Sequence, residues 1–279
     1  MSEAIPVPPS RHVLRFDRAD RTLHGFLMLS FLGLAATGMP LLFSDAPWAA
    51  RLARLLGGFV VTHRLHRVFA TIMIVVFVAH VARLVVRVAV RKDYSIFWGP
   101  ASMVPQPRDL TEMFQHVRWF LGQGERPAFD RFTYWEKFDY WAVFWGMAII
   151  GGSGLMLWFP VAFARVLPGW VFNIALLVHG EEALLAVGFI FTIHFFNSHL
   201  RPGKFPMDMV IFTGRVTEQE LREERPLEFA RRQLDPGRHD AGPVSPRAWL
   251  IGRLVGSAAV IIGLALVALI LYAVASQQL

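Results

Sequence analysis

The sequence predicts an all-α integral membrane protein, with a four-helix transmembrane bundle followed by a fifth, C-terminal transmembrane helix. Of its 279 residues, 54% are hydrophobic and 18% are charged, whereas soluble domains carry about 25% charged residues. Several stretches are apolar over the whole thickness of a bilayer. The sequence shows no strand-like alternation and no glycine motif typical of nucleotide binding, so we do not expect a soluble nucleotide-dependent enzyme.

Five stretches are long enough to cross the hydrocarbon core, which takes about 20 helical residues. They cover residues 25–43, 68–90, 140–164, 170–198 and 254–275. The first and third contain no charged residue, and the fifth is uniformly aliphatic and contains no His. The connection between the fourth and fifth stretches is too polar to insert. There we expect a short amphipathic helix around residues 218–233, interrupted by Pro226.

Lys and Arg alternate in density between successive connections, and this orients the chain. The N-terminal arm, the 91–139 connection and the 201–247 connection are rich in Arg, whereas the connection after the third stretch offers only Arg165. The N-terminus is therefore expected in the cytoplasm and the C-terminus in the periplasm. We expect a cytoplasmic arm (1–22), a four-helix domain (23–200), a cytoplasmic basic loop (201–247) and a fifth membrane helix (248–279). The net charge of +7 then reflects topology, and no nucleic-acid partner is expected.

The chain has ten His and no Cys, which excludes disulfides, iron–sulfur ligation and covalently attached haem. Ionisable residues inside a membrane are costly and often functional. Seven His lie in, beside or just past the first, second and fourth stretches: His24, His63, His66, His80, His179, His194 and His199. We expect His12, His116 and His239, which lie in polar segments, to be solvated.

The spacing of four of these His places them at two heights in the membrane. His66 and His80 are 14 residues apart and His179 and His194 are 15 apart, so each pair lies on roughly one helix face, about 21–22 Å apart along the axis. His66 and His179 then share an outer level, and His80 and His194 share an inner level. Two opposed imidazoles at each of two heights suit two stacked bis-His haems.

Other interpretations of these His remain open. Each His alone is as consistent with hydrogen-bonded packing as with ligation. Zinc is disfavoured, because the chain has no H-E-x-x-H motif and 14 or 15 residues is too long a spacing for one tetrahedral site on one helix. His24, at the cytoplasmic start of the first stretch, is also available at the inner level.

Three His-centred segments carry a family resemblance: RTLHGF in the first stretch, HRLHRVF in the second and LLVHGEEA in the fourth. Together with EKFDYWAVFWG and GRVTEQELREERP, they resemble the cytochrome b (gamma) subunit of membrane-bound formate dehydrogenases and the related Ni–Fe hydrogenase cytochrome b. Within this family, KFDYWAVFWG and HFFNSHLRPGKF look closer to members that serve multihaem periplasmic cytochromes. The resemblance runs from about residue 15 to 232. It implies two non-covalent b haems.

The resemblance implies His66 and His179 as ligands of the outer haem and His24 and His194 as ligands of the inner haem. Spacing alone favours His80 as the partner of His194, so His80 remains an alternative ligand or a residue of the haem edge or quinone site. The interval between the two His of the fourth stretch is one residue longer than in the family. It predicts a local bulge or a rotated ring.

The resemblance also implies a quinone or menaquinone site on the cytoplasmic side, beside the segment RFTYWEKFD at residues 131–139. Thr133, Trp135 and Glu136 replace the Asn, Gly and Gln of the family pattern there. The polar groups expected near the quinone are Thr133, Glu136, His80 and His199. A surface loop is the other interpretation of this segment.

The implied function is electron transfer between the quinone pool and a periplasmic electron-transfer subunit, a multihaem cytochrome c or an iron–sulfur protein, in a bacterial inner membrane. The chain would be the electron-transfer subunit of an oxidoreductase complex, without catalytic residues of its own. The alternative is a haem-free transporter or anchor that uses intramembrane His and Glu. Glu181 and Glu182 are expected either to pair with Arg64 and Arg67 or to reach water. Residues 151–154 (GGSG) are expected either to let helices pack closely or to leave room for a porphyrin.

Overall fold

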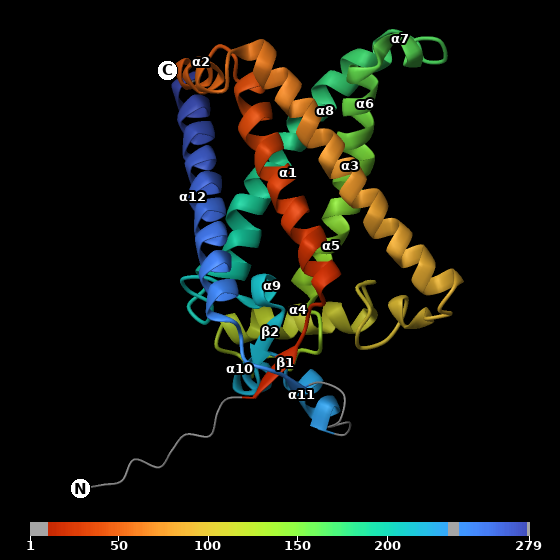
Figure 1. The fold of residues 1–279 in the computed structure, drawn as a ribbon, viewed down its shortest axis with the longest axis vertical. Helices are drawn as coiled ribbons and strands as arrows, with labels where there is room; N and C mark the ends of the chain where they lie inside the picture. Colours follow the sequence, from red (N-terminus) through yellow and green to blue (C-terminus); the bar gives the residue numbers. More distant parts are fainter. Residues whose placement is uncertain (1–10, 234–239, 278–279) are drawn as a thin grey trace, which may run out of the picture. The chain divides into compact units, whose positions relative to one another are not determined.

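A computed structural model describes residues 11–233 and 240–277, and its main elements are five helices long and apolar enough to cross a membrane (Figure 1). These candidate spans are Arg18–Leu42, Phe59–Ala89, Tyr134–Trp158, Trp170–Leu200 and Pro246–Ser276. All five predicted stretches are confirmed as helices, except that the third, predicted to reach residue 164, ends at Trp158, where Phe159 leaves the helical conformation before Pro160. Most of the helices extend past the apolar residues, because backbone hydrogen bonding continues into the polar residues at the interface.

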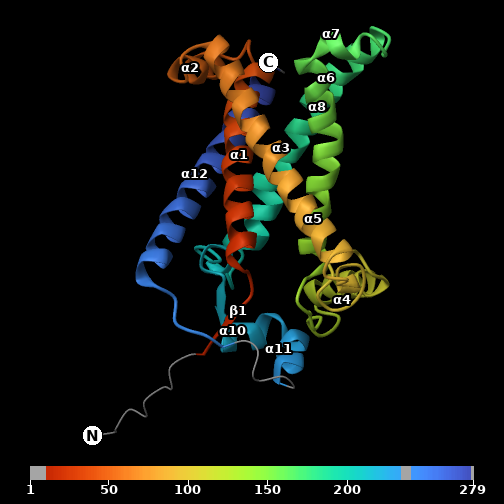
Figure 2. The same ribbon diagram turned by 45° about the vertical axis from the view of Figure 1, so that its right-hand side comes forward.

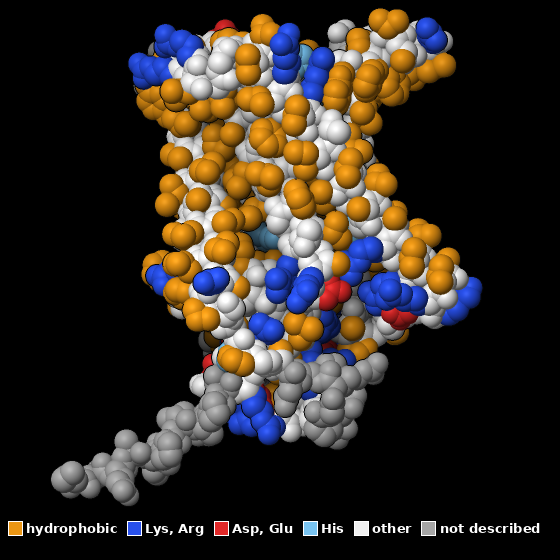
Figure 3. Space-filling model, viewed as in Figure 1, with side chains coloured by type: hydrophobic (Ala, Val, Ile, Leu, Met, Phe, Trp, Pro, Cys, Tyr) orange, Lys and Arg blue, Asp and Glu red, His pale blue; other side chains and the backbone are white. Residues whose placement is uncertain are grey.

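The spans are built from the following elements: α1 (Arg18–Leu42), α3 (Phe59–Ala89), α5 (Tyr134–Gly146) with η2 (Met147–Gly151) and α6 (Gly152–Trp158), α8 (Trp170–Phe189) with η3 (Ile190–His194) and η4 (Phe196–Leu200), and α12 (Pro246–Gln277). Figure 3 shows mostly hydrophobic side chains over the long helices, with Lys and Arg gathered near their ends. Val75, Leu176 and Ile261 are 61%, 65% and 67% exposed. Such exposure of aliphatic side chains fits a lipid-facing surface.

Three segments of these spans are π-helical: η2 in the third span, and η3 and η4 in the fourth. A π-turn accommodates an extra residue in an α-helix and is frequent at functional sites. Of the two alternatives for the longer interval between His179 and His194, a local bulge or a rotated ring, the bulge is present, and η3 ends at His194.

The chain divides into two compact units. Unit 2 comprises residues 22–86, 141–208 and 253–279 and contains most of the membrane helices. Its core joins Ala35 and Met39 of α1 to Phe191 of η3 and Ile270 of α12. α12 approaches closely because Gly263 has no side chain: a methyl group there would lie 2.7 Å from the Phe191 ring. Within this unit, Figures 1 and 2 both show α6 beside α8.

Unit 1 comprises residues 1–21, 87–140 and 209–252, and its described part contains a small antiparallel sheet. The strands β1 (His12–Leu14), β2 (Arg215–Thr217) and β3 (Asp240–Ala241) are ordered β2-β1-β3, with His12 opposite Thr217. Val13, Val216 and Leu221 form its core. Strands of two or three residues are too short to produce a detectable alternation, so the sequence did not predict this sheet.

The amphipathic helix expected at 218–233 is present as two pieces. α10 (Glu218–Glu224) is capped by Thr217, whose hydroxyl accepts a hydrogen bond from the Glu220 N–H at 3.1 Å. α11 (Pro226–Gln233) begins at the proline, so the predicted interruption is confirmed. The remaining short elements are α2 (Pro47–Leu55), η1 (Tyr94–Ile96), α4 (Pro107–Phe120), α7 (Pro160–Phe163) and α9 (Val210–Thr213).

Buried ion pairs join the separate segments of unit 1. Glu228 is 2% exposed and contacts Arg131 at 3.2 Å, Arg232 at 2.6 Å and Arg15 at 4.0 Å. Burial alone raises the pKa of Glu228, but the positive charges of Arg15 and Arg131 and the hydrogen bond from Arg232 outweigh it, so the pKa lies below its usual range. Several of the arginines that indicate topology therefore also hold this unit together.

We expect Glu228→Gln to destabilise unit 1 by about 3 kcal/mol, because three arginines would lose their shared carboxylate in a buried setting. The melting temperature in detergent measures this effect. A carboxyl group whose pKa is lowered by folding stabilises the folded state at pH values above its unfolded-state pKa of about 4.3. This stabilisation is lost as the pH falls through the pKa of the folded state. The difference in melting temperature between the wild type and Glu228→Gln should therefore become smaller in acid. Glu223→Gln, an exposed residue of α10, is the control, and an equal loss from both variants would contradict this role.

Candidate functional site

The structure brings His66 of α3 and His179 of α8 together in unit 2, with their rings in an edge-on (T-shaped) arrangement. Their ring centroids are 6.2 Å apart and the ring planes cross at 82°. These residues come from two different spans and are 113 positions apart in the chain (179 minus 66). The two His that the sequence predicts at one outer level therefore lie together.

One ring nitrogen of His66 is held by a hydrogen bond. Its Nδ1 lies 3.0 Å from the hydroxyl of Thr37, which itself donates to the carbonyl oxygen of Gly33 at 2.6 Å. A hydroxyl has a single proton, so toward His66 the Thr37 oxygen can only accept. Nδ1 of His66 therefore carries the proton, and Nε2 keeps its lone pair.

His179 is held in the same way by the third span. Its Nδ1 lies 3.0 Å from the carbonyl oxygen of Ile150, which belongs to the π-helical segment η2. A carbonyl oxygen only accepts, so Nδ1 of His179 also carries the proton. The Ser153 hydroxyl lies 3.3 Å from the same nitrogen. Both rings thus present Nε2 as the available basic atom, the arrangement that orients metal-ligating His.

The spacing of the two rings fits a metal ion bound between them. A metal–imidazole bond of about 2.0–2.1 Å on each side of one ion would place the centroids of two rings whose Nε2 atoms point at that ion roughly 6 Å apart. The observed distance is 6.2 Å. The described residues contain no group of three or more His, Cys, Asp or Glu able to hold a metal ion. A pair of His suits a metal that brings its other ligands with it, as haem iron does.

Glycine makes room for each imidazole. A methyl group at Gly38 of α1 would lie 3.0 Å from Cε1 of His66, and one at Gly154 of α6 would lie 2.9 Å from Cε1 of His179. Both rings pack directly against backbone. The GGSG stretch therefore does more than bring helices together, since its last glycine accommodates the ring of His179.

The second group of His lies elsewhere in unit 2. His24 of α1 is close enough to His194 and His199 for their charges to interact. His199 is 8% exposed and its Nδ1 has no hydrogen-bond partner. His80 packs its ring against Phe144, with centroids 6.2 Å apart. The proximity of His24 to His194 agrees with the pairing that the resemblance implies; the ligand role of His24 or of His80 stays a prediction.

Thr133 and Glu136, expected beside a quinone, form a capping box at the start of α5. The Thr133 N–H and hydroxyl donate to one Glu136 oxygen at 2.8 and 2.9 Å, and the Glu136 N–H donates back to the Thr133 hydroxyl at 3.4 Å. The other Glu136 oxygen accepts from Arg225 at 2.9 Å. Thr133 is fully buried, so the surface-loop interpretation is wrong for it. The polar atoms of this pair are used within unit 1, and their quinone contact stays a prediction.

Glu181 and Glu182 do not pair with Arg64 or Arg67 among the described residues. Glu182 accepts a hydrogen bond from the Trp145 indole at 3.3 Å, and Glu181 is exposed. Arg67 instead lies over the ring of Trp158, 5.4 Å from its centroid. The expected charge pair between these carboxylates and Arg64 or Arg67 is therefore not formed.

The expectation that His116 is solvated is wrong. His116 is 9% exposed, and its Nδ1 hydrogen-bonds the Tyr134 hydroxyl at 3.0 Å. Aromatic rings surround it, with Phe120 stacked at 4.6 Å and Trp135 at 5.3 Å between centroids. The aromatic residues that follow His116 in α4 and begin α5 could have indicated in the sequence that His116 is buried. His12 lies half-buried in β1, and His239 lies outside the described residues.

Glu112, one turn before His116, is also buried, and one of its oxygens has no partner. Burial raises the pKa of Glu112 above the usual carboxyl range, and this effect prevails over the opposing positive charge of Arg108. The buried face of α4 therefore carries titratable groups that the sequence did not single out.

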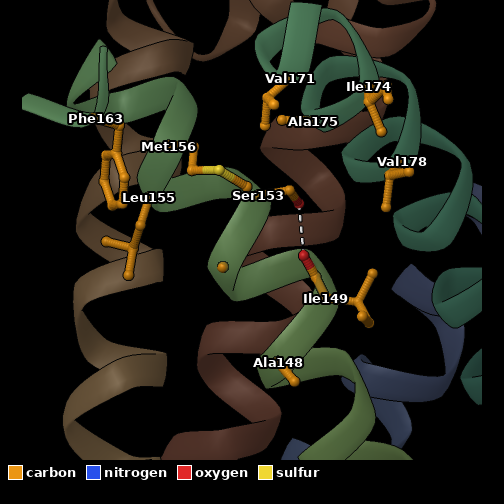
Figure 4. A pocket seen from close by; sticks show the side chains of 11 residues that line it. Ala148, Ile149, Ser153, Leu155, Met156, Phe163, Val171, Ile174, Ala175 and Val178 are labelled. Carbon is orange, nitrogen blue, oxygen red and sulfur yellow. Dashed lines mark hydrogen bonds between the residues drawn. The ribbon is translucent and has the colours of Figure 1, made fainter. Parts of the chain in front are cut away.

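An apolar pocket of about 410 Å³ lies between the η2–α6 stretch and α8 (Figure 4). Its lining is aliphatic and aromatic apart from Ser153, whose hydroxyl donates to the Ile149 carbonyl at 2.6 Å. Neither His66 nor His179 is among its lining residues. This pocket suits hydrocarbon and offers no polar chemistry.

No family model and no curated protein matches the chain. The arrangement of its own residues therefore carries the functional argument. Two oriented imidazoles within an apolar bundle can hold a metal-centred planar cofactor.

We expect Gly154→Ala to destabilise unit 2 by about 1–3 kcal/mol, because the added methyl group collides with a ring held by a buried hydrogen bond. Gly152→Ala is the matched control: a methyl group there would have no atom within 4 Å, and Ala is the better helix former, so this variant should be neutral or more stable. Thermal unfolding in detergent compares the two. Equal melting temperatures would show that the close contact at Gly154 has no cost.

Proposed function

We propose that this protein is a b-type cytochrome membrane subunit that transfers electrons between the quinone pool and a redox partner on the opposite side of the membrane. The observation that carries the proposal is the close pair His66 and His179, with ring centroids 6.2 Å apart and both Nδ1 atoms engaged in hydrogen bonds. A haem bound there would supply reversible one-electron transfer at its iron.

The chain's own residues would bind and orient this group. His66 and His179 would supply the axial nitrogens. Thr37 and the Ile150 carbonyl hold the two rings in the tautomer that leaves Nε2 basic, and such partners raise the ligand strength of a metal-bound imidazole. The apolar spans exclude water, which removes competing ligands and lowers the local dielectric.

A second b haem is proposed at the other group of His, with His24 and His194 as its ligands. Support comes from the proximity of His24 to His194 and from the π-bulge that ends at His194. His80 is the alternative ligand. Two haems at two heights would give electrons a path across the bilayer.

The quinone is proposed as the membrane-soluble electron carrier on the cytoplasmic side. Oxidation of a quinol releases two electrons and two protons, so a group that accepts a hydrogen bond or a proton from its hydroxyl is needed. His199 supports this role because it is buried with an unpartnered Nδ1. His80 is a further candidate in the same unit. Thr133 and Glu136 belong to unit 1, and their contact with the quinone stays a prediction of the family resemblance.

The partner is proposed to be a periplasmic electron-transfer subunit, a multihaem cytochrome c or an iron–sulfur protein, in a bacterial inner membrane. The Lys and Arg distribution supports an N-terminus in the cytoplasm and a C-terminus outside. Chemistry on a substrate would then belong to the partner. The chain would supply haem ligands, spacing and insulation.

His179→Ala should remove one of two haems, because the outer pair shares no ligand with the inner pair. The ratio of haem to protein, measured as the pyridine haemochrome, should fall from about two toward about one. His63→Ala is the control, since His63 is an exposed residue less than one turn from His66. An unchanged ratio in His179→Ala would show that this residue is not a ligand.

The inner ligand is decided by comparing His24→Ala with His80→Ala. We expect His24→Ala to lose the inner haem and His80→Ala to retain both haems, because His24 lies near His194 whereas His80 packs on Phe144. Reduced-minus-oxidised spectra and haem content report the result. Loss of a haem in His80→Ala alone would show that spacing along the helix is the better guide.

A further inference from the structure

The helix α4 exposes its apolar face and buries its polar face, which is the reverse of a helix on the surface of a water-soluble protein. Leu110, Phe114, Val117 and Leu121 fall within an arc of about 60°. They are 60%, 63%, 49% and 65% exposed. An exposed apolar stripe of this length is unusual in water and marks an interaction surface.

The opposite side of α4 is polar and buried. Asp109, Glu112 and His116 are 6%, 7% and 9% exposed. Both Asp109 oxygens accept hydrogen bonds from the Lys137 ammonium at 2.8 Å, and His116 bonds the Tyr134 hydroxyl. The polar face is therefore held by the first turn of α5, and the apolar face points away from it.

The position of α4 in the chain places it at a membrane surface. It lies between the end of α3 at Ala89 and the start of α5 at Tyr134, which are two successive candidate spans. Because each span crosses the bilayer once, α3 ends and α5 begins on the same side. The connection that contains α4 is therefore on the side of the membrane at which both spans meet the headgroup region.

The flanking residues match the chemistry of a lipid headgroup region. Tyr94 and Trp98, just after α3, are 59% and 66% exposed, and aromatic residues of this kind gather at membrane interfaces. Arg91, Lys92 and Arg118 are exposed as well and provide positive charge for anionic headgroups.

We propose that α4 is an interfacial helix whose apolar face is immersed in the lipid of the leaflet at which α3 ends and α5 begins. A helix with one strongly apolar face, one polar face, a low net hydrophobicity and cationic flanks lies in the plane of that interface. Lipid on one side and the first turn of α5 on the other then cover both faces. The proposal rests on the membrane-spanning fold and is independent of haem binding.

Site-directed spin labelling tests the proposal directly, because the chain contains no Cys and a single introduced Cys is the only thiol. Phe114→Cys, spin-labelled in the full chain and placed in nanodiscs of phosphatidylcholine and phosphatidylglycerol, should be several-fold more accessible to oxygen than to a water-soluble nickel chelate. Gln115→Cys is the matched control, since it is exposed and turned by about 100° from Phe114. It should show the reverse preference.

Two outcomes would overturn the proposal. A label at Phe114 that favours the nickel chelate would place this face in water, and a label shielded from both reagents would indicate a covering protein. Leu110→Cys, on the same face, gives an independent measurement if Phe114→Cys does not fold. Neither outcome would alter the haem content, so failure here is distinguishable from failure of the cytochrome proposal.

Discussion

The absence of water in a bilayer decides how an imidazole can be kept inside this protein. A ring nitrogen that carries a proton must find an acceptor within the protein, because an unsatisfied polar group in hydrocarbon costs several kcal/mol. His66 uses Thr37 of the first span, and His179 uses the Ile150 carbonyl of the third. These bonds leave both Nε2 atoms basic and bring four spans to one point. Gly38 and Gly154 give the rings their space, so helix packing and ligand orientation depend on the same few residues.

Much of the fold could be predicted from composition, because a membrane span needs only length and apolarity. All five spans were located, and the bulge observed as η3 was one of two alternatives for the extra residue between His179 and His194. The sheet of unit 1 could not be predicted, since strands such as His12–Leu14 are held by pairing between segments about two hundred residues apart. The ion pairs around Glu228 join distant segments in the same way, and no local pattern reveals them.

The candidate site was predictable in part. Helical periodicity and the family resemblance indicated that His66 and His179 share one level, but spacing could not identify Thr37 or Ile150 as their partners. His116 was misjudged because its segment is polar on average, whereas the helix directs that polarity toward the first turn of α5 and its apolar side outward. Thr133 and Glu136 were singled out for a ligand, yet their sequence also forms a capping box. A short motif can therefore serve the fold while resembling a binding site.

The central claim is that the pair His66 and His179, together with the second group of His, holds haem. The most direct measurement is the absorption spectrum of the purified wild-type protein, oxidised and then reduced with dithionite, with haem content measured on the same sample. A sharp α-band on reduction and about two haems per chain are the predicted result. A protein that is folded, yet shows no such band even after expression with excess haem, would contradict the account and leave a haem-free transporter or anchor in its place.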